Sequence, residues 1–147
     1  MKPLFILLTV LSSLFTSSSF AKDKNVNDAA VRSFNSTFIN AAEVKWSVTN
    51  TMYKADFSLN GQYASAFFNY DGELIAVTRN ISSFQLPITL QANLKKDYAG
   101  FWVTELFEIS ADGTTEYYIT LENADEQLVL KAYPGSSWSK HKKTRKI

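Results

Sequence analysis

Few residues in this chain could carry out acid–base or nucleophilic chemistry. Among its 147 residues there is one histidine, His141, and there is no cysteine. A Ser-His-Asp triad or a Cys-His pair needs a histidine held inside a folded site, but His141 lies in a basic run near the end of the chain. Zinc sites built from His and Cys need several such ligands. The sequence therefore predicts neither a nucleophilic active site nor a transition-metal site.

Pairs of carboxylates are the other candidates for catalysis. Glu105 and Glu108 occupy positions of opposite parity in a predicted strand, so they point to opposite faces. Asp125-Glu126 is typical of a solvated turn. The chain has neither a Gly-rich phosphate loop nor the ligand pattern of an EF-hand. We therefore predict a protein without enzyme activity, metal ion or cofactor. The catalytic alternative would need two acidic groups that converge in a cleft.

Aromatic side chains at alternating strand positions are the strongest candidates for binding. Their alternation directs them to the side of a predicted sheet that helices would leave uncovered. A contiguous patch of exposed aromatic residues is typical of a binding surface. The candidate partner-binding residues are Tyr63, Phe67, Trp102, Leu106, Tyr118 and Tyr133. The alternative is ordinary packing beneath the tail, a loop or a second copy of the chain.

The strands that position these residues are marked by alternation and by turn dipeptides. Asn60-Gly61 and Asp71-Gly72 easily adopt the positive φ angles of tight hairpin turns. They divide residues 53–79 into three strands, and such short turns make neighbouring strands antiparallel. Further strands are predicted at 44–48, 101–109, 115–122, 127–133 and 136–139. In the strand 101–109, alternation places Phe101, Val103, Phe107 and Ile109 toward the helices and Trp102 and Leu106 away from them.

Two helices are predicted to cover the sheet. Asn27 or Asp28 can cap the first helix, whose apolar stripe is Ala30, Phe34 and Phe38. Pro87 begins the second helix, which repeats leucine every four residues at Leu86, Leu90 and Leu94. The order helix, strands, helix, strands predicts an α+β fold with helices packed on one face of a single antiparallel sheet. The two halves, about 28–79 and 86–139, read as diverged copies of one helix-plus-hairpin unit.

The start of the chain has the pattern of a secretory signal peptide. A basic Met1-Lys2 precedes the apolar run Leu4–Leu11, and Ser19-Phe20-Ala21 offers small residues for a signal peptidase. We predict a signal at 1–21, cleaved after Ala21. The alternative, a membrane anchor, is weaker because spanning a bilayer takes ~20 apolar residues. One domain, 22–139, would follow the signal.

A basic tail, 140–147, completes the predicted organisation. It contains Lys140, Lys142, Lys143, Arg145 and Lys146, whereas the preceding domain is acidic. A basic tail on an acidic domain is not the pattern of a nucleic-acid-binding protein. We interpret the tail as a solvated, frayed end. The alternative is a tether to anionic lipid or polymer.

Several short segments resemble the β-lactamase-inhibitor-like (BLIP-like), PepSY-like exported proteins of Bacteroidetes. The resemblance covers about residues 28–135 and rests on the order and spacing of the segments. They are Phe38-Ile39-Asn40, Val44-Lys45-Trp46, Tyr53-Lys54-Ala55-Asp56-Phe57, Phe68, Asp71-Gly72-Glu73-Leu74, Leu86-Pro87, Tyr98-Ala99-Gly100 and Tyr117-Tyr118. The chain departs from the family pattern at Ile39 and Ala99, where proline is usual, and at Pro134-Gly135, where Asp-Gly is usual. These departures affect turns rather than the fold.

The resemblance implies helices on one antiparallel sheet whose other face is uncovered, and it implies no enzyme activity and no cofactor. The family's namesake is an inhibitor that binds a β-lactamase, and PepSY modules are associated with peptidase inhibition. We predict an exported, non-enzymatic binding module, periplasmic or secreted, that binds an unidentified protein and inhibits a protein or peptidase through its aromatic face. We predict no nucleic acid partner and no transmembrane segment after signal removal. The alternative is a periplasmic binder of a small ligand or envelope polymer, with a pocket between sheet and helices.

Overall fold

The computed structural model describes residues 26–146, so the predicted signal peptide lies outside the described residues. The elements are α2 (Asp28–Thr37), β1 (Ala42–Val48), β2 (Tyr53–Leu59), β3 (Gln62–Phe68), β4 (Leu74–Asn80), the 3-10 turn η1 (Ser83–Gln85), α3 (Ile88–Asp97), β5 (Trp102–Ala111), β6 (Thr114–Glu122), β7 (Glu126–Ala132) and β8 (Ser139–Arg145). In this part of the chain no helix is long and apolar enough to cross a membrane.

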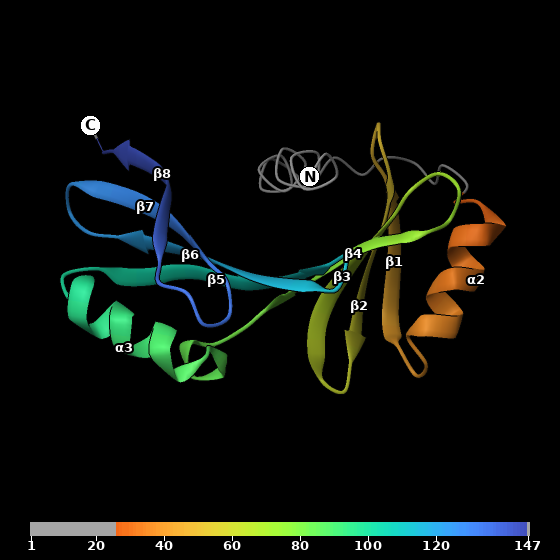
Figure 1. The fold of residues 1–147 in the computed structure, drawn as a ribbon. Coiled ribbons are helices and arrows are strands. Elements are labelled where there is room, and N and C mark those ends of the chain that lie inside the picture. Colours follow the sequence, from red (N-terminus) through yellow and green to blue (C-terminus); the bar gives the residue numbers. More distant parts are fainter. Residues whose placement is uncertain (1–25, 147) are drawn as a thin grey trace.

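The strands form one eight-stranded antiparallel sheet in which spatial order follows chain order, β1 to β8. The sheet is bent, and both helices lie on its outer side (Figure 1). The predicted α+β fold is therefore confirmed. A helix followed by four strands occurs twice along the chain. We call the side under α2 and α3 the helix face and the opposite side the concave face.

Helix α2 is capped and packed as its sequence predicts. The side chain of Asn27 accepts a hydrogen bond from the N–H of Ala30 at 2.8 Å, which satisfies one donor of the first turn. Ala30 and Phe34 are buried, and the ring of Phe34 lies 5.0 Å from that of Phe57 on β2. The apolar cluster around them takes Ala55, Phe57, Ala66 and Phe68 from β2 and β3. The predicted core stripe of this helix is confirmed.

The turns of the first half need backbone angles that glycine allows. The β2–β3 hairpin closes through Asn60 and Gly61, with φ angles of 52° and 79°. Gly72, before β4, has φ 87°, and a Cβ on it would lie 2.6 Å from Ala29 of α2. Gly72 therefore serves both a left-handed backbone and the close approach of the helix.

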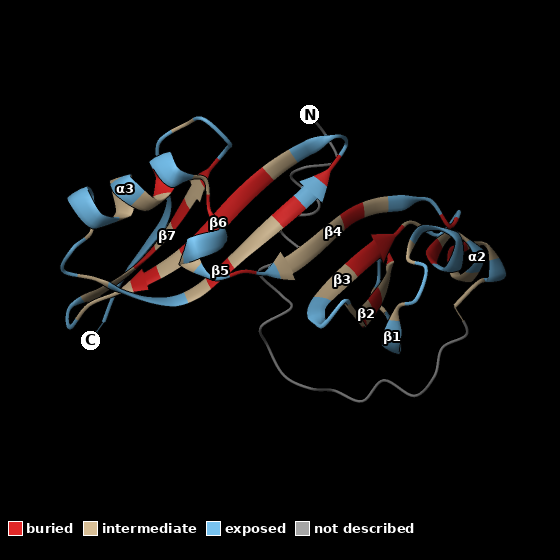
Figure 2. Cartoon of the chain, turned by 90° about the horizontal axis from the view of Figure 1, so that it is seen from below, coloured by how far each residue is buried: buried red, intermediate tan, exposed pale blue. Residues whose placement is uncertain are grey.

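Helix α3 covers the second half of the sheet. Leu86 and Leu90 are buried, and Leu94 and Tyr98 pack beside them. The indole Nε1 of Trp138 donates to the carbonyl of Leu90 at 3.0 Å, which fixes the β7–β8 connection against the helix. The outer surface of α3 is exposed while the strand segments behind it are buried (Figure 2). The predicted leucine row is confirmed as core.

The two halves meet where β4 pairs with β5, from Ala76 opposite Ala111 to Asn80 opposite Phe107. On the helix face, Arg79 binds Glu108 through two hydrogen bonds, Nε to Oε1 at 2.9 Å and Nη2 to Oε2 at 3.2 Å. This two-point geometry is among the stronger forms of ion pair, so it reinforces the junction between the halves.

The described residues of the basic tail, up to Lys146, are ordered rather than frayed. Residues 139–145 form β8, which pairs with β7 at the edge of the sheet. Lys143 forms an ion pair with Glu126 on β7. The interpretation of a frayed end is therefore wrong, because backbone pairing and this ion pair hold the segment in place.

Candidate binding face of the sheet

A β-bulge in β5 decides which side chains reach the concave face. Trp102 and Val103 pair with Glu122 and Leu121, but the next pair joins Glu105 to Thr120. Thr104 is therefore an extra residue with no partner of its own on β6. Because side chains alternate, one extra residue reverses the faces of every later residue in the strand.

The bulge overturns the prediction for Leu106. Its side chain lies on the helix face, where it is buried in the cluster that contains Leu90 and Ile119. Phe107 and Ile109, predicted to face the helices, lie on the concave face instead. The sequence signal was Glu105, the one charged residue in the set predicted to be apolar. A bulge at Thr104 explains it, because it turns Glu105, together with Phe107 and Ile109, away from the helices and onto the concave face.

An apolar cluster lies along the concave face where the two halves join. Phe107 and Tyr118 pair across β5 and β6, and their rings stack with centroids 5.4 Å apart. Tyr118 also meets the ring of His141 on β8 edge-on at 5.6 Å. The cluster consists of Met52, Phe67, Ala76, Ile109, Ala111 and Tyr118, with Phe107 and Val129 packed against it. Its members come from both halves, so the concave face is continuous across the junction.

A buried ion pair lies beside this cluster. Glu116 is 3% exposed, and Lys131 Nζ lies 3.0 Å from its Oε2. The hydroxyl of Tyr118 donates to the same oxygen at 3.1 Å. The ammonium of Lys131 also lies 5.5 Å from the ring centroid of Tyr118 and 4.9 Å from that of Tyr133. One lysine thus neutralises a buried carboxylate and contacts two aromatic rings.

The titration of these groups follows from their surroundings. Burial lowers the pKa of Lys131, but hydrogen bonds with Tyr133, Glu116 and Tyr118 outweigh that effect and raise the pKa above its ordinary value. Burial raises the pKa of Tyr118 to about 12. At neutral pH Lys131 is therefore charged, and Tyr118 is a neutral hydrogen-bond donor.

Other aromatic side chains of the concave face are exposed to solvent. Tyr63, Trp102 and Tyr133 are 69%, 52% and 43% exposed. The ammonium of Lys146 lies 5.2 Å from the ring centroid of Trp102 and 2.8 Å from Oε2 of Glu122. Trp102 and Tyr133 each carry a lysine over the ring, which limits the orientations that the ring can adopt. These aromatic residues are accessible to a partner.

The predicted binding residues thus divide into three groups. Tyr63, Trp102 and Tyr133 lie exposed on the concave face. Phe67 and Tyr118 lie on the same face but are buried in its cluster. Leu106 lies on the helix face and does not belong to the site. Sequence reasoning missed Glu116 and Lys131, because only the strand register shows that Tyr118 lies opposite Lys131.

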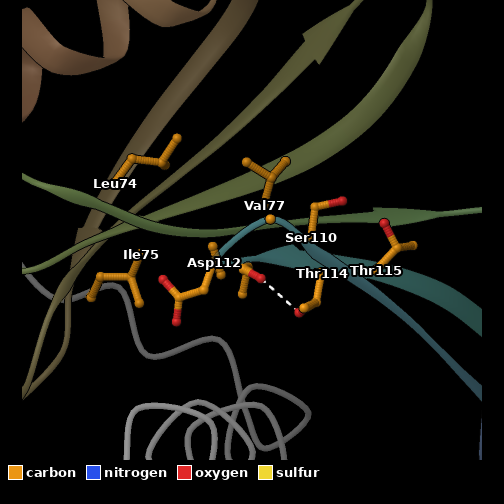
Figure 3. Close-up of a pocket in the computed structure, with 10 residues that line it drawn as sticks. Leu74, Ile75, Val77, Ser110, Asp112, Thr114 and Thr115 are labelled. Carbon is orange, nitrogen blue, oxygen red and sulfur yellow. Dashed lines mark hydrogen bonds between the residues drawn. The ribbon is translucent and has the colours of Figure 1, made fainter. Parts of the chain in front are cut away.

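Two hollows are lined by strand and hairpin residues of the described part of the chain. The larger, of about 370 Å³, lies between Leu74–Val77 of β4 and residues 110–115 of the β5–β6 hairpin (Figure 3). The Thr114 hydroxyl donates to the Ala111 carbonyl there, at 2.7 Å. The smaller, of about 250 Å³, is lined by β2, β3 and β4. Neither hollow is lined by a residue of α2 or α3.

Comparison with known proteins supports this fold. No protein-family model matches the chain, and no curated protein is significantly similar to it. Among solved structures, a BLIP-like protein from Bacteroides fragilis is 16% identical with a TM-score of 0.72, over 84% of this chain and 88% of that chain. A DUF2874 family protein from Bacteroides ovatus is 19% identical with a TM-score of 0.73, over 84% and 89%. A presumed periplasmic protein from Bacteroides eggerthii is 14% identical with a TM-score of 0.73, over 83% and 90%.

At these identities the likeness establishes the fold. The resemblance to BLIP-like proteins of Bacteroides that the sequence predicted is confirmed at that level. The PepSY-like part of the resemblance stays a prediction.

Proposed function

We propose that this chain is an exported, non-enzymatic module that binds a protein partner through the concave face of its sheet. The observation that carries the proposal is the exposure of Trp102 on that face, with Lys146 above its ring. Tryptophan and tyrosine are the side chains most enriched at the energetic centres of protein interfaces. A ring already held by a cation loses less conformational entropy when a partner binds.

The arrangement of the face supports a protein partner rather than a small molecule. Tyr63 is on β3, Trp102 on β5 and Tyr133 follows β7, so the exposed aromatic side chains are spread across both halves of the sheet. Such a spread suits a broad, shallow contact of the size that protein partners make. A small ligand instead needs a concave pocket that surrounds it.

The names of two similar structures agree with this proposal. One is called BLIP-like and another a presumed periplasmic protein. They favour an exported binding protein, and inhibition of a protein or peptidase is the finer form of the proposal. The alternative, a pocket for a small ligand or envelope polymer between sheet and helices, is weaker. Apolar side chains fill the space beneath both helices there.

The double variant Trp102→Ala plus Tyr133→Ala tests the proposal. Both side chains are substantially exposed, so we expect the thermal midpoint to change little while partner capture from the exported protein fraction is lost. Phe84→Ala is the matched control, because Phe84 is 87% exposed on η1 and its carbonyl accepts a hydrogen bond from Gln91 of α3, the helix on the other side of the sheet. Capture of the same proteins by the double variant and by the wild type would contradict the proposal. A large fall in stability would show instead that these rings are structural.

A further inference from the structure

The outer edge of β8 has no neighbouring strand in the sheet that the described residues form, and it is positively charged. β8 is the last strand of the sheet, and every one of its residues is exposed. It carries Lys140, His141, Lys142, Lys143 and Arg145, and Lys146 follows directly. A strand at a sheet edge presents backbone groups that can pair with another chain. This edge therefore offers both hydrogen-bonding groups and a concentrated positive charge.

The backbone beyond residue 141 is regular. His141 is an extra residue in β8, since Leu130 pairs with Lys140 and Val129 pairs with Lys142. From there the pairing runs without interruption to Arg145 opposite Glu126, and the N–H of Lys146 donates to the carbonyl of Asp125 at 2.9 Å.

The direction of the outward backbone groups follows from this hydrogen bond. Backbone groups alternate between the two sides of a strand. Since the N–H of Lys146 points to β7, those of Lys143 and Arg145 point to the outer edge.

Part of the positive charge of this edge is already neutralised. Lys143 is paired with Glu126, and Lys146 with Glu122. Among residues 26–146, Lys142 and Arg145 form no ion pair. Lysines on an edge strand protect against self-association, and pairing β8 with a second β8 would place like charges opposite each other, which is unfavourable. The same charges favour a strand that carries carboxylates.

We propose that the outer edge of β8 binds an extended acidic peptide segment of a partner protein, which adds to the sheet as a further strand. Hydrogen bonds to the backbone of Lys143 and Arg145 align the segment. Lys142 and Arg145 select carboxylates, on the concave and helix faces respectively, because they occupy positions of opposite parity. The residues that this inference uses, Lys142, Lys143 and Arg145, are not among the aromatic residues of the proposed function, so the inference does not depend on that function.

Fluorescence anisotropy with a short labelled peptide of alternating Glu and Val tests the charge requirement, with the corresponding Lys and Val peptide as control. We expect Lys142→Glu plus Arg145→Glu to weaken binding of the acidic peptide by at least about tenfold. Lys95→Glu plus Lys96→Glu on α3 changes the net charge equally and should leave binding nearly unchanged. Circular dichroism of both variants confirms that they fold. Equal weakening by both variants would overturn the proposal.

A second pair of variants tests the backbone. Arg145→Ala and Arg145→Pro lose the same charge, but only the proline also loses the outward N–H, a change that an edge strand tolerates. We expect Arg145→Pro to bind the acidic peptide several-fold more weakly than Arg145→Ala, and the amides of Lys143 and Arg145 to gain hydrogen-exchange protection in the wild-type complex. Equal binding by the two variants would overturn strand addition.

The identity of the partner is tested with other anions and with the protein itself. Heparin or anionic vesicles that bind with the same variant dependence, or a dimer that uses this edge, would overturn the choice of an acidic peptide.

Discussion

The ammonium group of Lys131 on β7 lies 3.0 Å from a carboxylate oxygen of Glu116 on β6, and Glu116 is almost completely buried on the concave face of the sheet. The same ammonium lies over the ring of Tyr133, which is exposed to solvent. The ion pair therefore connects the interior of the concave face to its accessible surface. The position of the ammonium over Tyr133 therefore depends on this ion pair.

We expect Glu116→Gln to destabilise the protein by about 2–4 kcal/mol, because it leaves the charge of Lys131 largely buried without its partner. Urea denaturation followed by circular dichroism measures the change in the free energy of unfolding. Glu126→Gln is the control, since its ion pair with Lys143 is more exposed and should contribute less than about 1 kcal/mol. Equal changes in the free energy of unfolding would show that the buried ion pair stabilises the protein no more than the exposed one.

Burial raises the pKa of Glu105 on the concave face. A carboxyl group whose pKa is higher in the folded state adds stability at low pH, and this stability is lost as the pH rises through the folded pKa. Glu105→Gln should therefore raise the thermal midpoint at neutral pH and have less effect at a pH below the ordinary pKa of glutamate.

The pKa of Glu122 is shifted in the opposite direction, below its ordinary value. Hydrogen bonds from Lys146 and then from Gln127 lower its pKa, so its contribution is present above the unfolded pKa and is lost as the pH falls through the folded one. Glu122→Gln should lower the thermal midpoint at neutral pH. Differential scanning calorimetry across the acidic range checks both directions, and shifts of the same sign in the two variants would refute this account.

The position of Leu106 tests the bulge in β5. Because its side chain packs beneath α3 in the cluster with Leu90, Leu106→Ala should cost about 2–5 kcal/mol. Leu74→Ala is the control, because Leu74 is partly exposed at the start of β4 and should cost less than about 1 kcal/mol. If Leu106→Ala were as mild as Leu74→Ala, the strand would lack the bulge and Leu106 would face the partner after all.

Gly72 offers a test of the packing between α2 and the sheet. An alanine there would bring its Cβ to 2.6 Å from the backbone of Ala29, whereas a Cβ on Gly113, which also has a positive φ angle, meets nothing within 4 Å. Both substitutions suffer backbone strain, but only Gly72→Ala also displaces the helix. We expect Gly72→Ala to cost about 2 kcal/mol more than Gly113→Ala in chemical denaturation. Equal costs would show that α2 can move away freely.

Most of the fold could be predicted from the sequence because its turns and helices have strong local signals. Asn60-Gly61 marks a hairpin by backbone preference alone, and the stripe of Ala30 and Phe34 indicates a helix with one buried face. These signals involve only a few neighbouring residues, so they can be recognised without knowledge of tertiary contacts.

The failures of prediction lie where long-range pairing decides the outcome. The extra residue Thr104 has no distinctive side chain, and only Glu105 in an apolar set indicated that the alternation was broken. β8 is almost entirely polar, so it lacks the apolar alternation by which strands are recognised, and its order comes from pairing with β7. The ion pair between Glu116 and Lys131 depends on the register of β6 and β7, which no local pattern fixes.

Site-specific photo-crosslinking tests the central claim most directly. A photoreactive phenylalanine analogue is placed at Trp102 or Tyr133 on the concave face, and at Phe84 on η1 as the control, in cells that produce the protein. We predict that both concave-face positions yield the same protein adduct and that the control position does not. Adducts at position 84, with none at position 102 or 133, would contradict a recognition surface on that face.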